Sequence, residues 1–111
     1  MDTLLPTMFS DGTPPETVDA FRASMRAFHP AGFRAMARAS AESVREVLPR
    51  INVPTLLVHG DQDVRAPLAV AEDLHQAIAG SSLVVLPGGG HVCNIEAREA
   101  FDRAVRGFLR A

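Results

Sequence analysis

The stretch that decides the fold reads V-P-T-L-L-V-H-G-D-Q-D-V-R-A-P at residues 53–67 and S-L-V-V-L-P-G-G-G-H at residues 82–91. Residues 53–60 and 82–87 are short runs rich in Val and Leu, a pattern typical of strands buried on both faces of a sheet. Between them, Pro67, apolar residues at helical spacing and Gly80 predict a helix of about three turns. Strand, helix and strand in this order predict an α/β fold with two parallel strands joined by a right-handed crossover helix.

Acidic residues and a histidine follow the two predicted strands. Asp61 and Asp63 come just after the first strand, and His91 comes just after the second. Because parallel strands end at the same edge of a sheet, we expect Asp63 and His91 to lie close together. A carboxylate beside a histidine fixes the tautomer of the ring, so that the other ring nitrogen can act as a general base. The pattern therefore predicts the acid and the base of a catalytic triad.

The segment before the first strand is predicted to be helical. Residues 1–10 are apolar without a clear period and form an extended or short helical lead-in. Thr13 is expected to cap a helix that ends at His29 before Pro30. Further helices are expected at residues 31–39 and 41–48, the second ended by Pro49. The apolar residues expected to be buried on these three helices are Val18, Phe21, Met25, Phe28, Phe33, Met36, Val44, Val47 and Leu48.

One closing helix is predicted after His91. Asn94 is expected to cap it, and Glu96 is favourable in its first turn because the helix dipole is positive there. Its apolar stripe is expected to be buried, and its arginines are expected to face water. The stripe consists of Phe101, Ala104, Val105, Phe108 and Leu109, and the arginines are Arg98, Arg103, Arg106 and Arg110.

Length and composition limit the possible classes. The chain has 111 residues, 47% of them hydrophobic, and a net charge of −2, which fits at most one globular domain and offers no basic patch for nucleic acid. No apolar run reaches the roughly 18 residues that span a bilayer, and the first residues lack the pattern of a signal peptide. The single cysteine fits a reducing compartment. We therefore expect a cytoplasmic protein without a nucleic-acid or membrane partner, a metal or a cofactor.

Residues 51–67 and 83–96 carry a specific resemblance. The words I-N-V-P-T-L-L-V-H-G-D-Q-D-V-R-A-P and L-V-V-L-P-G-G-G-H-V-C-N-I-E resemble the carboxyl-terminal part of an α/β-hydrolase-fold serine hydrolase, in a style similar to enol-lactonase and esterase-like members. The resemblance implies that Asp63 is the triad acid and His91 the triad base, and that Asn94 and Glu96 are supporting residues. It also implies two parts, a helical cap segment at residues 1–49 and the carboxyl-terminal part of the hydrolase core at residues 50–111.

The sequence departs from the family pattern at the nucleophile. It contains no G-x-S-x-G, and none of its serines stands on a predicted strand–turn–helix elbow. Loss of the nucleophile from a triad costs about six orders of magnitude in turnover. We therefore expect a hydrolase part for a small ester, lactone or related acyl substrate that is inactive by itself. The serines are Ser10, Ser24, Ser40, Ser43, Ser81 and Ser82.

Two alternatives remain open. Dehalogenases, epoxide hydrolases and haloperoxidases resemble the same fold and use the same partnership of histidine and acid. A non-catalytic module could instead pair through its sheet edge, because two interior-type strands leave an unpaired edge that attracts another strand. The expected partner at that edge is the missing amino-terminal half of the hydrolase, a second copy, or another chain.

Other polar residues near the motif have more ordinary interpretations. Asp61 is expected to form a turn, and His59 to be a core histidine bonded to the backbone. His29 and His75 are expected to be solvated. Cys93 lies too close to His91 in the sequence to attack with its help, so we expect a small buried thiol there.

Overall fold

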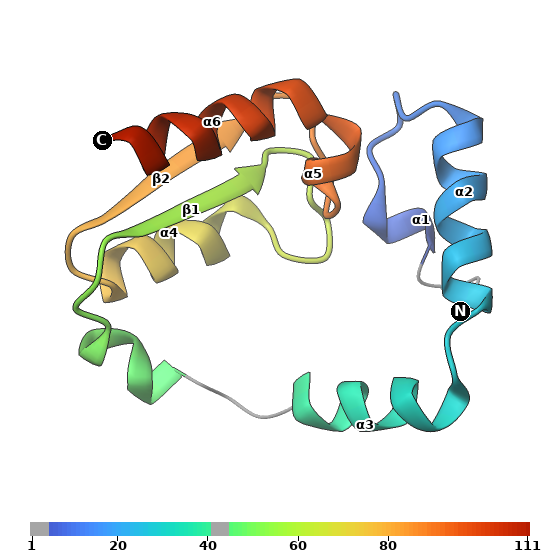
Figure 1. The fold of residues 1–111 in the computed structure, drawn as a ribbon, viewed down its shortest axis with the longest axis horizontal. Coiled ribbons are helices and arrows are strands. Elements are labelled where there is room, and N and C mark those ends of the chain that lie inside the picture. The colour runs from blue at the N-terminus through green and yellow to red at the C-terminus, as the bar shows by residue number, and fades with distance from the viewer. Residues whose placement is uncertain (1–4, 41–44) are drawn as a thin grey trace.

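The structure is a computed structural model that describes residues 5–40 and 45–111. Helices come first, and the two strands lie in the second half of the chain (Figure 1). In order, the elements are α1 (Leu5–Met8), α2 (Pro15–Arg26), α3 (Pro30–Ser40), the 3-10 helix η1 (Arg45–Arg50), β1 (Thr55–Gly60), α4 (Leu68–Ala77), β2 (Ser81–Leu86), α5 (Cys93–Glu96) and α6 (Arg98–Arg110).

The strands β1 and β2 pair in parallel, which confirms the predicted strand–helix–strand unit. Their register runs from Thr55 opposite Ser81 to Gly60 opposite Leu86. The crossover helix α4 begins one residue after Pro67, which occupies the N-cap position, and Gly80 turns the chain into β2 with φ of 75°. Helices α4 and α6 both contact the strands and lie on opposite sides of them (Figure 1). This arrangement is the α/β unit that the sequence predicts.

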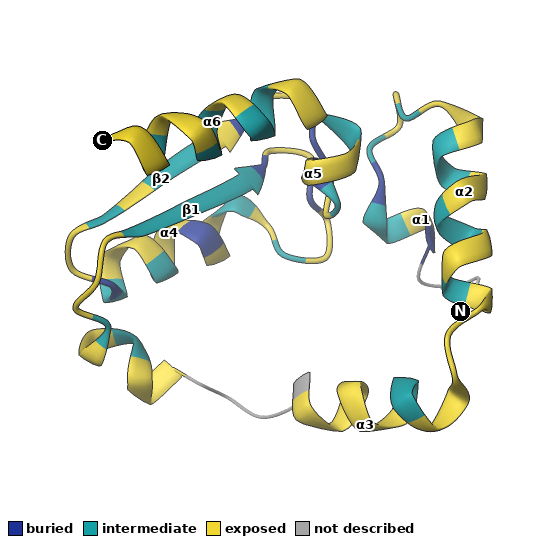
Figure 2. Cartoon of the chain, viewed as in Figure 1, coloured by how far each residue is buried: buried dark blue, intermediate teal, exposed yellow. Residues whose placement is uncertain are grey.

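The core of this unit is thin. Both strands are mostly half-buried although helices lie on either side, because their outer edges have no neighbouring strand within the described residues (Figure 2). The chain exposes 7884 Å², whereas a compact monomer of its mass would expose about 6,000 Å². Among the described residues, the buried apolar ones are Leu5, Phe9, Ala71, Ile78, Leu86 and Cys93.

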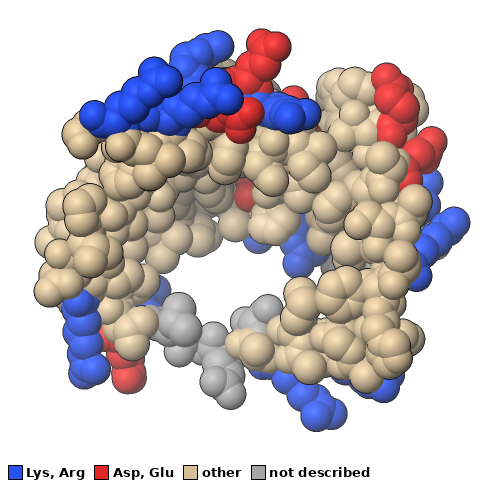
Figure 3. All heavy atoms as spheres, viewed as in Figure 1, with Lys and Arg blue, Asp and Glu red and all other residues tan. Residues whose placement is uncertain are grey.

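The molecule is also more open than a compact domain. Its radius of gyration is 15.3 Å, compared with about 13 Å for a compact chain of this length. Figure 3 shows the surface hollowed between the helical segment with α2 and α3 on one side and the strand unit on the other. Both measures describe a chain that leaves a large surface uncovered.

The helical segment confirms the predicted elements and corrects several details. Thr13 does not cap α2, whose N-cap residue is Pro14. The helix ends at Arg26 instead of His29, and α3 starts at Pro30. Phe28, Met36 and Val47 were expected to be buried but are 40%, 57% and 46% exposed, because the described residues place no layer over them.

The third predicted helix, residues 41–48, falls partly outside the described residues. Residues 41–44, with Val44, are not described, and the rest forms the 3-10 helix η1. Pro49 lies inside η1 and does not end it. The tighter 3-10 geometry is common in such short connecting turns.

The closing segment is two helices instead of one. Asn94 lies within α5, and α6 begins after a break at Ala97 whose φ of −119° and ψ of 49° are not helical. The predicted buried stripe of α6 is only half-buried at Phe101, Ala104, Val105 and Phe108, and Leu109 is 74% exposed. The four arginines of α6 are exposed as predicted and gather over that helix in Figure 3.

Candidate active site

The turn after β1 holds Asp63 in a fixed orientation. Its Oδ1 accepts hydrogen bonds from the backbone amides of Arg65 at 3.0 Å and Ala66 at 2.9 Å. An aspartate that binds amides two and three residues ahead in this way stabilises a turn. Asp63 is buried, with 7% of the residue exposed, and its second oxygen remains available to a partner.

The loop after β2 carries His91 and lies against the end of β1. The Gly88 amide, at a residue with φ of 77°, donates to Oδ1 of Asp61 at 2.7 Å, and the Gln62 amide donates to the Gly89 carbonyl at 2.8 Å. A Cβ on Gly60 would lie 2.6 Å from the Gly90 carbonyl, so glycine is required for this close approach. Asp61 is thus a turn residue that ties the two loops together, as expected.

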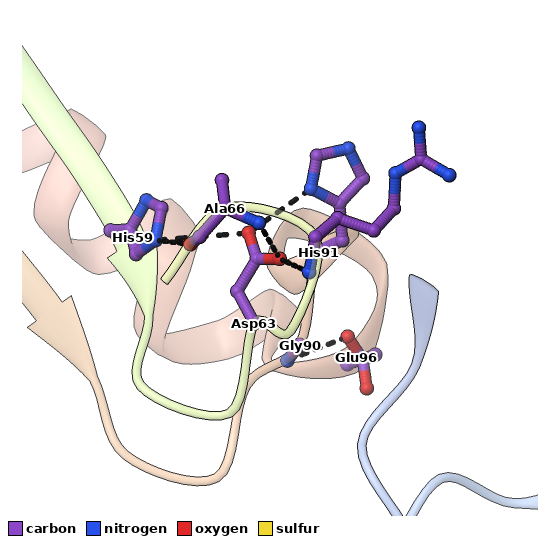
Figure 4. Close-up of polar contacts among 7 residues, drawn as sticks. His59, Asp63, Ala66, Gly90, His91 and Glu96 are labelled. Atoms are coloured by element: carbon purple, nitrogen blue, oxygen red, sulfur yellow. Dashed lines mark hydrogen bonds and ion pairs between the residues drawn. The ribbon is translucent and has the colours of Figure 1, made fainter. Parts of the chain in front are cut away.

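The two loops bring Asp63 and His91 together at the carboxyl ends of the strands (Figure 4). Nδ1 of His91 lies 3.0 Å from Oδ2 of Asp63. The aspartate side chain is 4% exposed, whereas the histidine side chain is 38% exposed. Since an ionised carboxylate can only accept, Nδ1 of His91 carries the proton and donates it, which leaves Nε2 of the neutral ring as an acceptor.

His59 is a second histidine beside the same carboxylate. Its Nε2 lies 2.7 Å from the Ala66 carbonyl and 3.7 Å from Oδ2 of Asp63 (Figure 4). The bond to a backbone carbonyl matches the expected core histidine. The sequence pattern did not predict that His59 lies near the acid. The signal was its position one residue before the end of β1, next to the turn that carries Asp63.

The surroundings of Asp63 favour its ionised form. Burial alone would raise the pKa of this carboxyl, but the amide of Ala66, the hydrogen bond and charge of His91, and the amide of Arg65 together lower the pKa below its usual value. The acid is therefore a carboxylate across the neutral range, as an acceptor for the Nδ1–H of His91 must be.

Cys93 is a buried thiol on α5. The residue is 7% exposed, and burial raises the pKa of its thiol, with further increases from the charges of Glu96 and Asp63. A thiol without access or thiolate character is a poor nucleophile. The structure thus matches the expected role of Cys93 in packing.

Glu96 has a larger part in the site than its predicted place in a helix indicates. Its carboxylate accepts from the amides of Ser10 and Gly90 and from the hydroxyl of Thr13. Local sequence patterns assigned Thr13 and Glu96 to two separate helix starts. Only the tertiary structure brings these two residues together.

Within residues 5–40 and 45–111, no group of three His, Cys, Asp or Glu side chains could hold a metal ion. None of the helices in these ranges combines the length and the apolar character needed to cross a membrane.

Known proteins share this architecture. The protein is 32% identical over 106 residues to a pimeloyl-[acyl-carrier protein] methyl ester esterase from Neisseria meningitidis, covering 96% of this chain and 35% of that enzyme. An esterase from Exiguobacterium antarcticum superposes with a TM-score of 0.89 at 29% identity, over 99% of this chain and 41% of that one. A bromoperoxidase from Bacillus anthracis gives a TM-score of 0.83 at 27% identity, over 99% of this chain and 42% of that one.

The chain thus spans well under half the length of these relatives. The model of an α/β-hydrolase family described as TAP-like protein matches residues 18–111, which is most of the sequence. This match agrees with the parallel strand unit, the flanking helices and the esterase-like neighbours. The chain forms a carboxyl-terminal part of the α/β-hydrolase fold, and it belongs to this TAP-like family of α/β-fold hydrolases.

Proposed function

We propose that Asp63 and His91 are the acid and the base of a Ser-His-Asp triad that cleaves a small ester, lactone or related acyl substrate. The observation that carries the proposal is the 3.0 Å contact between Nδ1 of His91 and Oδ2 of the buried Asp63. The carboxylate orients the ring and stabilises the imidazolium. Nε2 of His91 then takes the proton of the attacking hydroxyl and returns it to the leaving group.

In this proposal the serine comes from outside the present chain. No serine in the sequence stands in G-x-S-x-G. The expected source is the amino-terminal half of the hydrolase. Its strands would pair along the edge of β1 that faces away from β2. The excess exposed surface supports a partner at this edge, and a second copy or another chain pairing there is the non-catalytic alternative.

Within the proposed enzyme, the two parts of the chain have different tasks. Residues 1–49 form a helical cap segment, and residues 50–111 complete the core and supply the acid and the base. The cap segment leaves apolar side chains exposed, such as Phe28 in the connection between α2 and α3 at 40%, which suits a lining for an acyl group.

A haloperoxidase reaction is a second candidate within the same fold. It is favoured by the likeness to the Bacillus anthracis bromoperoxidase, with a TM-score of 0.83. It would use the same acid and histidine, so activity towards an ester and towards halide with peroxide must both be measured.

The orienting role can be tested on the 111-residue chain by NMR of the histidine ring nitrogens. We expect neutral His91 to carry its proton on Nδ1 in the wild type, and to lose this fixed tautomer in Asp63→Ala. His75→Ala, which removes an exposed histidine, is the control and leaves the His91 signals unchanged. A wild-type His91 with its proton on Nε2 would contradict the proposal.

The external nucleophile has its own test. The purified chain should hydrolyse p-nitrophenyl acetate no faster than an equal concentration of its His91→Ala variant. Hydrolysis by the wild type that disappears in His91→Ala would show that the chain contains a nucleophile after all.

A further inference from the structure

The Glu96 carboxylate lies between two segments that are far apart in the sequence. Its Oε1 accepts hydrogen bonds from the Ser10 amide at 2.7 Å and from the Thr13 hydroxyl at 2.6 Å. Its Oε2 accepts a hydrogen bond from the Gly90 amide at 2.8 Å (Figure 4). One oxygen thus serves the segment that leads into α2, and the other serves the residue directly before His91.

The segment 8–13, here called the strap, follows the histidine loop closely. Beyond the Glu96 contacts, the Val92 amide donates to the Met8 carbonyl at 3.2 Å, so the strap is attached on both sides of His91. A Cβ on Gly90 would lie 2.7 Å from Oε2 of Glu96 and 2.8 Å from the Ser10 nitrogen. The loop at Gly90 therefore has no free space in which to move independently of the strap.

The strap is in turn attached to the cap helix. The ring of Phe9, which is buried, packs edge-on against Phe21 of α2 with 5.3 Å between ring centroids. The packed aromatic pair therefore joins α2 to the strap. Ser10 and Thr13 in turn join the strap to Glu96.

We propose that Glu96 is a positioning residue that couples the place of the cap helix α2 to the place of His91. The inference rests on the proposed role of His91 as the base. Because each carboxylate oxygen serves a different segment, a rotation of the group that follows the strap breaks the bond to Gly90. Displacement of α2 by a ligand would then free the loop that carries His91. Docking of α2 would hold that loop in the position seen in the structure.

The test is a double-mutant cycle on the 111-residue chain, read by amide exchange and by the ring signals of His91. Thr13→Val removes the hydroxyl that reaches the loop through Glu96. We expect it to speed exchange of the Gly90 amide and to shift the His91 ring signals. Thr17→Val, one helical turn further along, is the matched control and should change neither.

Glu96→Gln completes the cycle. A glutamine offers one accepting oxygen and one donating amide, so it can serve only one of the two segments. Exchange of the Ser10 or Gly90 amide should become roughly tenfold faster, the factor expected when a hydrogen bond to a charged acceptor is lost. Glu99→Gln, an exposed neighbour, should leave both rates unchanged. In the Glu96→Gln background, Thr13→Val should no longer affect Gly90 or His91.

Two results would overturn the coupling. One is an effect of Thr13→Val that stays within residues 8–13, and the other is an effect on Gly90 that persists in Glu96→Gln. The His91 tautomer is measured separately, so the two proposals fail separately. A wrong tautomer with intact coupling removes the catalytic role, whereas a correct tautomer without coupling removes only the positioning role of Glu96.

Discussion

His91 lies at the end of one parallel strand and Asp63 at the end of its neighbour, and their side chains meet with 3.0 Å between Nδ1 and Oδ2. The acid is 4% exposed and the histidine 38% exposed. A buried carboxylate that holds one nitrogen of an accessible imidazole leaves the second nitrogen for chemistry. The geometry of this pair supports the proposed general base.

The pH dependence of stability should reflect Asp63. Its pKa is lowered in the folded chain, so the unfolded chain, with a pKa of about 3.9, binds the proton first as the pH falls. The stabilisation by the carboxylate is complete above the unfolded pKa and is lost as the pH falls through the lower folded pKa. Asp63→Asn should be less stable at pH 7 and should show a flatter loss of stability below about pH 4.

Urea unfolding followed by circular dichroism between pH 7 and pH 3 measures this dependence. Asp73→Asn, on the exposed side of α4, is the control. Its free energy of unfolding should fall with pH as that of the wild type does. If the free energy of unfolding fell equally between pH 7 and pH 3 in Asp63→Asn and in the wild type, the Asp63 carboxylate would have no partner in the folded chain.

Gly60 should be intolerant of any side chain. In Gly60→Ala, the new methyl group would meet the backbone of Gly89 and Gly90, which cannot yield as a flexible side chain can. We expect a loss of about 1–3 kcal/mol, the usual cost of overpacking, and a shift of the His91 signals.

Gly107→Ala provides the matched control, since a Cβ there would meet nothing within 4 Å beyond the adjoining residues and backbone of its own helix. In the helix α6, alanine should be neutral or stabilise by up to about 1 kcal/mol. Thermal unfolding of both variants compares them directly. Equal stability of the two variants would contradict the packing of the histidine loop on β1.

Cys93 should react slowly in the folded chain. Burial, with the added effect of the Glu96 and Asp63 charges, raises the pKa of its thiol, so little thiolate forms and little of it is accessible. Labelling with Ellman's reagent at pH 8 should be slow in buffer and fast in urea. Rapid labelling in buffer would show that α5 is not packed on the Gly89 loop.

His59 should support the turn that carries the acid. His59→Leu removes the 2.7 Å contact with the Ala66 carbonyl and should cost about 1 kcal/mol. Gln76→Leu, at an exposed residue of α4, should remain within about 0.5 kcal/mol of the wild type. The denaturant midpoints of the two variants are compared. A midpoint of His59→Leu as high as that of the control would mean that His59 does not support the turn.

The sequence predicts the strand unit and the contact between Asp63 and His91 because both follow from local patterns and the parallel topology. Apolar runs, Pro67 and Gly80 mark β1, α4 and β2, and the parallel topology then brings Asp63 and His91 to one edge. The contacts of Glu96 could not be predicted in this way, since Ser10 and Thr13 are far away in the sequence.

The burial of the outer helices was also beyond the sequence. Met36, Val47 and Leu109 stand at helical spacings that normally mark a buried face, yet they are 57%, 46% and 74% exposed. A periodic pattern indicates which face of a helix is apolar. It does not indicate whether the residues that cover this face belong to the same chain. These exposed residues agree with the large uncovered surface and with a partner that completes the fold.

The proposal that this chain supplies the acid and the base of a hydrolase can be tested with a chimera. The chain would replace the matching segment of the Exiguobacterium antarcticum esterase, and a folded chimera would be assayed with p-nitrophenyl acetate. We expect hydrolysis that His91→Ala lowers by about 10⁴-fold or more, while His75→Ala leaves it intact. A folded chimera without hydrolysis, or with hydrolysis that survives His91→Ala, would contradict it.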